Sequence, residues 1–185
     1  MEIALDRTYR VYRWLLDNLV GHGAAIIMLG SVLLAIFEII RRYIFGVVYD
    51  WGQDAVTYFT VGSIYLYFAV TQARRSHLAV SALMDYIKGR GYLKLVLVVR
   101  LIVTAGSLVM YGAIIYYGWS TVIRAQMLER TTQSMMLLIW PFQFILMLGF
   151  ILMAVTLVFQ LYQDYQAVRN KTVFAWAPAE EGLEV

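Results

Sequence analysis

Residues 37–80 read FEIIRRYIFGVVYDWGQDAVTYFTVGSIYLYFAVTQARRSHLAV, and this stretch decides the fold. It leaves one apolar segment through a charged, aromatic turn, crosses a second apolar segment and ends in a basic cluster. Charged and aromatic residues at the ends of long apolar segments are typical of membrane spans. We therefore interpret the stretch as a membrane hairpin and the rest of the chain as its support.

The composition is that of a membrane protein. Of the 185 residues, 62% are hydrophobic and 15% are charged, whereas soluble domains are about half apolar and about a quarter charged. The net charge of +3 comes from basic residues beside apolar spans, which usually set orientation in the membrane. It therefore gives no indication of nucleic-acid binding.

The chain has no cysteine and only two histidines. The lack of cysteine excludes disulfides, iron–sulfur clusters and thiol catalysis. Because there are only two histidines, bis-histidine haem ligation is implausible. The sequence also lacks a phosphate loop, a metal-ligand cluster and a nucleophile–base set. We therefore expect no cofactor and no enzymatic activity.

The apolar runs predict an all-α integral membrane protein with four transmembrane helices. Each run is long enough to cross a hydrocarbon core of about 30 Å. The second is less purely apolar than the others, because threonine, serine and tyrosine recur along it, so we expect it to prefer protein neighbours on at least one face. The four predicted spans are Leu19–Ile40, Trp51–Ala73, Leu95–Trp119 and Leu138–Leu161.

We divide the chain into three parts. Residues 1–18 are a cytoplasmic interfacial segment, residues 19–162 the transmembrane domain, and residues 163–185 a disordered cytoplasmic tail. The first part has no apolar core of a signal peptide, so we expect the first span to remain as an anchor. It forms either an interfacial helix or a short solvated lead-in. In the helix, a basic stripe would face lipid headgroups: Arg7, Arg10 and Arg13.

The distribution of lysine and arginine predicts that both termini are cytoplasmic. The N-terminus, the 74–94 loop and the tail together hold ten of them, whereas the two other loops hold four. Short interfacial helices are part of this prediction, including one over Leu78–Ile87 in the basic loop. Arg100, just inside the third span, can extend its side chain toward the same loop. Four tryptophans lie near span ends as predicted interface anchors: Trp14, Trp51, Trp119 and Trp140.

The charged turn after the first span is the main candidate for an interaction site. Glu38, Arg41 and Arg42 lie at i, i+3 and i+4 of a continuing helix, so they can pair on one face. Asp54 suits the dipole at the start of the next helix and is a further candidate partner for either arginine. We interpret the cluster as chiefly structural, with docking of an outer partner as the alternative. Similarly, His77 beside Arg74 and Arg75 is a simple interfacial residue, a ligand for lipid phosphate or a proton-responsive group.

The second, third and fourth spans have apolar centres without ionisable residues. Coupled carriers usually place such a residue, or a broken helix, near the middle of a span. Glu38 lies at the end of its span and does not meet that requirement. We therefore expect that this chain transports nothing by itself. The methionines, such as Met147 and Met153, are predicted to serve packing.

Three short motifs flank the second span: Arg42-Tyr43-Ile44-Phe45, Trp51-Gly52-Gln53-Asp54 and Arg74-Arg75-Ser76-His77. They resemble motifs of the small membrane subunit of TRAP (tripartite ATP-independent periplasmic) transporters. In that family the first span ends in Arg-Tyr and an aromatic, a tryptophan precedes an acidic pair, and Arg-x-x-His closes the second span. The resemblance covers roughly residues 19–162, and Trp140-Pro141 with Gly149 look like the entry to the fourth span.

The chain departs from the family pattern at three places. Gln53-Asp54 stands where an acidic pair is usual, Ser76 replaces a glycine, and a proline is missing near Leu148. These departures weaken the case that an acidic pair is essential here.

The resemblance implies an accessory role in the import of an organic acid across the bacterial inner membrane. A large polytopic subunit would carry the substrate and sodium sites, and a periplasmic binding protein would capture the acid. This chain would brace the large subunit within the phospholipid and help to dock the binding protein. The alternatives are an autonomous four-helix carrier or exporter, which usually has a glutamate in the middle of its first span, and a membrane enzyme.

Overall fold

The structure, a computed structural model, describes residues 2–74, 93–134 and 137–169. The regular elements of these residues are helical, and an isolated bridge joins Thr131 to Leu138. The all-α class is therefore confirmed. In chain order the helices are α1 Glu2–Trp14, η1 Leu15–Val20, α2 Gly21–Ile40, η2 Arg41–Phe45, α3 Gly52–Ala73, α5 Leu93–Met127 and α6 Trp140–Val168, where η marks π-helical turns.

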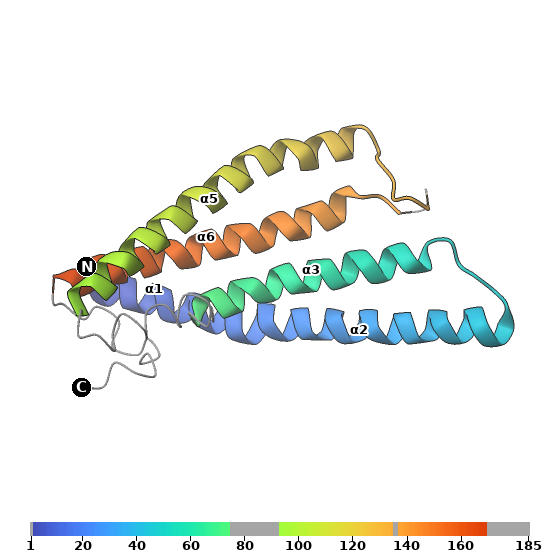
Figure 1. The fold of residues 1–185 in the computed structure, drawn as a ribbon, viewed down its shortest axis with the longest axis horizontal. Helices are drawn as coiled ribbons and strands as arrows, with labels where there is room; N and C mark the ends of the chain where they lie inside the picture. The colour runs from blue at the N-terminus through green and yellow to red at the C-terminus, as the bar shows by residue number, and fades with distance from the viewer. Residues whose placement is uncertain (1, 75–92, 135–136, 170–185) are drawn as a thin grey trace.

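Residues 2–45 form one unbroken helix (Figure 1). The junction residues Trp14 and Ile40 have ordinary right-handed helical backbone angles, so the π-helical turns continue the helix without a break. The helix ends at Gly46, whose φ of +68° is left-handed and favours glycine. The chain then turns back into α3.

The N-terminal part of this helix packs on protein along one side, and its place at the membrane interface stays a prediction. Tyr9 and Leu16 are 2% and 1% exposed, and the rings of Tyr9 and Phe159 lie 5.2 Å apart. Leu16 belongs to a buried cluster with Ala69 of α3. The side of this segment that carries Tyr9 and Leu16 is therefore covered by α6 and α3, where burial against apolar side chains is favourable.

Three of the four long helices are long and apolar enough to cross a membrane: Leu5–Phe45, Leu95–Met127 and Trp140–Val168. The first is roughly 60 Å long, about twice a hydrocarbon core, so it is tilted or extends beyond the core. The 22 residues of α3 reach about 33 Å, but hydroxyl side chains lower its hydropathy. A fourth span at α3 and the orientation of the chain both stay predictions.

Two helices run further than the sequence suggested. The residues after Trp119, expected as a polar connection, remain helical to Met127. Residues 163–168, assigned to the tail, continue α6 by nearly two turns, and the buried Asp164 bonds there to Thr104 of α5. Polar residues thus extend a helix where they have partners inside the protein. The short helix expected over Leu78–Ile87 lies outside the described residues.

The four long helices stand in an open row, in the order α2, α3, α6 and α5 (Figure 1). Extensive contacts among the described elements join each of these helices to its neighbour in the row and leave α2 and α5 at opposite edges. Large apolar side chains therefore point outward along the row, such as Ile26 of α2 and Val109 of α5, at 70% and 74% exposure. Such a surface requires lipid or another membrane protein to cover it.

Small residues bring α3 and α6 close together. A Cβ atom at Gly149 would lie 2.8 Å from the backbone oxygen of Tyr65, so glycine is required at this crossing. Met147 and Met153 are buried beside it and fill the contacts of α6 with α5 and α3. The packing role expected of these two methionines is confirmed.

Candidate functional sites at the two ends of the row

We call the end that holds Gly46 and the connection between α5 and α6 the turn end. The end that holds α1 and the last residues of α6 is the terminal end. The candidate residues that the structure describes lie at these two ends. Their actual partners differ in several cases from those that the sequence suggested.

Arg41 closes the turn between α2 and α3. Its Nη1 lies 3.5 Å from Oε1 of Glu38, and both side chains are nearly buried, at 11% and 13% exposure. Its guanidinium also lies 3.3 Å from the ring centre of Tyr49. The carboxylate of Glu38 packs directly over Gly52, where a Cβ atom would lie 2.5 Å from Glu38 Cδ. We call these four residues the Arg41 clamp.

Arg42 does not share this clamp. Its side chain is exposed, and within the described ranges it forms neither an ion pair nor a hydrogen bond. Tyr43, which follows it in the Arg-Tyr motif, is 81% exposed. The predicted pairing with an acid therefore occurs for Arg41 but not for Arg42, because the geometry of the helix turns Arg41 inward and Arg42 outward. Trp51 stacks on Tyr49, with ring centres 5.5 Å apart.

Asp54 holds the start of α3 to the connection before α6. Its Oδ2 accepts hydrogen bonds from the backbone N–H and the hydroxyl of Ser134, at 3.0 and 2.7 Å. The suggested pairing of Asp54 with Arg41 or Arg42 does not occur. A polar surface pocket of about 500 Å³ opens beside it, and its other lining residues are Asp50, Gln53, Thr57, Tyr58 and Gln133.

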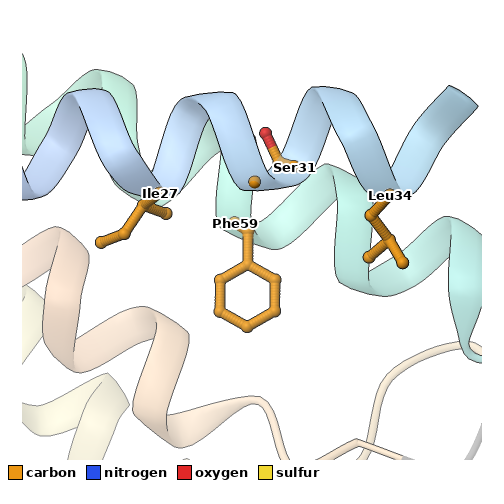
Figure 2. Close-up of a pocket in the computed structure, with 5 residues that line it drawn as sticks. Ile27, Ser31, Leu34 and Phe59 are labelled. Atoms are coloured by element: carbon orange, nitrogen blue, oxygen red, sulfur yellow. The ribbon is translucent and has the colours of Figure 1, made fainter.

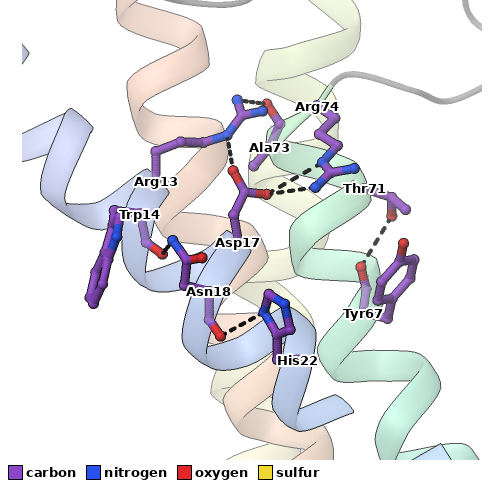
Figure 3. Close-up of polar contacts among 9 residues, drawn as sticks. All are labelled: Arg13, Trp14, Asp17, Asn18, His22, Tyr67, Thr71, Ala73 and Arg74. Atoms are coloured by element: carbon purple, nitrogen blue, oxygen red, sulfur yellow. Dashed lines mark hydrogen bonds and ion pairs between the residues drawn. The ribbon is translucent and has the colours of Figure 1, made fainter. Parts of the chain in front are cut away.

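At the terminal end, Asp17 joins two arginines (Figure 3). It lies 3.0 Å from Nε of Arg13 and 3.1 Å from Nη2 of Arg74. Arg13 also donates to the backbone oxygen of Ala73 at 2.7 Å, which caps the last turn of α3. Arg13 therefore binds protein rather than lipid headgroups.

The other members of the predicted basic stripe remain on the surface. Arg7 is exposed, and Arg10 forms an exposed ion pair with Asp6 at 3.2 Å. The predicted anchors Trp14 and Trp119 are exposed at 63% and 44%, whereas Trp140 is half-buried at the start of α6. Arg75 and His77 lie outside the described residues.

One side of α6 carries polar residues that bond to three other helices, an arrangement that sequence reasoning missed. Thr156, Gln160 and Asp164 are spaced four apart and are buried. We call them the polar ladder. Thr156 contacts the hydroxyl of Tyr12 in α1 at 3.0 Å. Gln160 contacts the side-chain amide of Gln72 in α3 at 3.0 Å. Asp164 contacts the hydroxyl of Thr104 in α5 at 2.9 Å.

An apolar groove of about 350 Å³ lies between α2 and α3 (Figure 2). Ile27, Leu34 and Phe59 point to its open side, while the Ser31 hydroxyl points away and accepts a hydrogen bond from Thr60 at 3.0 Å. Such a lining suits an acyl chain or an apolar side chain rather than a charged solute. Within the described ranges, no cluster of three histidine, aspartate or glutamate residues could hold a metal ion.

Long apolar helices joined by internal polar contacts define a helical membrane protein whose surface requires a cover. Residues 31–167 match the family model of the tripartite ATP-independent periplasmic transporters, DctQ component. The chain belongs to this family and is a small membrane component of a TRAP transporter. It is a multi-pass protein of the inner membrane and a transporter subunit rather than an enzyme. No curated protein and no solved structure matches the chain.

Family membership also implies partners. A tripartite system contains a large membrane component and a periplasmic binding component besides this one. The resemblance drawn from the Arg-Tyr, Trp and Arg-x-x-His segments is therefore confirmed at the level of the family.

Proposed function

We propose that this chain braces the large membrane component of a transporter for an organic acid and secondarily helps to dock the periplasmic binding component. The observation that carries the proposal is the open row of helices. Buried polar groups form hydrogen bonds between helices of the row, and exposed apolar residues cover its outer sides. A partner within the membrane can cover such a surface without disturbing any internal hydrogen bond.

The distribution of polar groups supports an accessory role. The polar ladder lies at the terminal end, and its members bond to α1, α3 and α5. The Arg41 clamp lies at the turn end and holds α2 to the start of α3. Because these groups are occupied by contacts within the chain, they support rigidity rather than the passage of a solute.

The proposed orientation places the terminal end in the cytoplasm and the turn end in the periplasm. Arg7, Arg10, Arg13 and Arg74 all belong to the terminal end, which agrees with the positive-inside rule. All four long helices then cross the membrane. The polar pocket beside Asp54 opens toward the periplasm, where a soluble partner with a basic side chain would meet two aspartates.

Two experiments test these assignments. Reporter fusions after Gly46 and Gln133 should report the periplasm, and fusions after Lys88 and Val185 the cytoplasm. A periplasmic signal after Lys88 contradicts the orientation. Separately, the tagged chain purified from its native membrane should carry a large many-span protein in a fixed ratio. Recovery of the chain only with copies of itself would instead favour an autonomous carrier.

A further inference from the structure

The two neighbouring arginines at the turn end have opposite environments. Arg41 is nearly buried in its clamp, whereas the exposed guanidinium of Arg42 has no acidic partner within the described ranges. The three residues that follow Arg42 are apolar or aromatic and strongly exposed: Tyr43 at 81%, Ile44 at 71% and Phe45 at 69%. A cation is thus set beside uncovered apolar surface.

The position of these residues explains their exposure. The helix formed by residues 2–45 runs past the start of α3 at the turn end, so its tip has no neighbouring helix (Figure 1). The turn that continues from it is also apolar and exposed at Val47 and Val48. An arginine and aromatic rings at the end of an apolar helix match the headgroup region of a membrane, where rings lie at headgroup level and arginine contacts phosphate.

We propose that Arg42, Tyr43, Ile44 and Phe45 form a phospholipid-binding corner. The guanidinium of Arg42 binds the phosphodiester of one lipid by paired N–H donors, and the three following side chains lie along its acyl chains. Under the proposed orientation this lipid belongs to the periplasmic leaflet. A soluble protein is a less suitable occupant, because its departure would expose this apolar tip to water.

The corner can be tested on the full-length chain in detergent by native mass spectrometry. Three ligands are titrated: phosphatidylglycerol, diacylglycerol with the same acyl chains, and glycerol phosphate. The first contains both parts of the lipid, the second lacks the phosphate and the third lacks the chains. Arg42→Gln is compared with Arg42→Lys and with the control Arg124→Gln, which removes an exposed arginine from the last turn of α5 at the same end.

The proposal predicts that the chain retains phosphatidylglycerol in preference to both fragments. Arg42→Gln should weaken this retention about tenfold, Arg42→Lys should weaken it less, and Arg124→Gln should leave it unchanged. Equal retention by Arg42→Gln and the original chain overturns the proposal, as does equal retention of diacylglycerol. If Arg42→Gln instead weakens capture of the purified binding component with no change in lipid retention, the residue docks a protein and the lipid corner is wrong.

Discussion

At the scale of single residues, one helical position separates two arginines into different roles. Arg41 is held between Glu38 and the Tyr49 ring, while Arg42 points outward. The sequence places both arginines on the same short helical segment, where either could pair with Glu38 or Asp54. Helix geometry sends the two side chains in different directions, and the turn that follows decides which of them meets protein, because Gly52 brings the start of α3 under Glu38. The Arg41 clamp is therefore a product of the turn.

Arg41→Gln should destabilise the protein far more than Arg42→Gln. Loss of Arg41 leaves the nearly buried carboxylate of Glu38 without its cation, at a cost of about 1–3 kcal/mol. Loss of the exposed Arg42 should change the unfolding free energy by less than about 0.5 kcal/mol. Thermal unfolding in the same detergent compares the two variants directly. A larger loss for Arg42→Gln contradicts the assignment of the clamp to Arg41.

At the scale of elements, α6 is the helix that bonds to three others. It meets α3 at the close approach of Gly149 to Tyr65, and its polar ladder bonds to α1, α3 and α5. Buried hydrogen bonds between membrane helices are modest individually, at about 0.6 kcal/mol on average. Their placement nevertheless fixes which faces meet, because a misaligned helix would leave buried polar groups unpaired.

Gly149→Ala should destabilise the contact of α3 with α6. The added methyl group would lie 2.8 Å from the backbone oxygen of Tyr65, and backbone cannot move aside cheaply, so we expect a loss of about 1–3 kcal/mol. The matched control is Gly106→Ala in α5, which has open space around its Cβ position. That variant should be neutral or slightly stabilising. Equal melting temperatures for the two variants would contradict the proposed crossing.

Tyr12→Phe tests whether α1 is fastened to α6. The variant keeps the ring contact with Phe159 but removes the hydroxyl that donates to the backbone oxygen of Leu152 at 2.6 Å. A loss of about 0.5–1.5 kcal/mol is expected by thermal unfolding. Tyr116→Phe is the control, because Tyr116 is 75% exposed. An unchanged melting temperature for Tyr12→Phe would favour an N-terminal segment that lies free on the membrane surface.

Periodicity and composition predicted the helices well, but they predicted only some of the helix ends and not the neighbours of each helix. The second span was placed within one residue of α3, because a charged turn and a basic cluster bracket it. The end of α6 at Val168 was not predicted, since Gln163 and Asp164 look like the start of a polar tail until their neighbours are known. The polar ladder had a signal in the spacing of Thr156, Gln160 and Asp164. Its partners in three distant helices could not be predicted from that spacing.

At the scale of the whole molecule, the open row of helices is the observation on which the proposed bracing role rests. Two of its helices lie at edges, and apolar side chains such as Ile26 and Val109 cover the outer sides. Lipid alone can cover these outer sides. A chain surrounded only by lipid would not need the rigid connection of α6 to α1, α3 and α5. A brace for a moving transport subunit does require such rigidity, which is the central claim of the proposed function.

Uptake into proteoliposomes tests that claim most directly. The substrate is the organic acid that the purified binding component retains, and a sodium gradient provides the driving force. Vesicles with this chain alone should take up none, and vesicles with both membrane components and the binding component should take it up. Omission of this chain from the complete system should reduce uptake strongly. Saturable uptake by this chain alone would contradict the account.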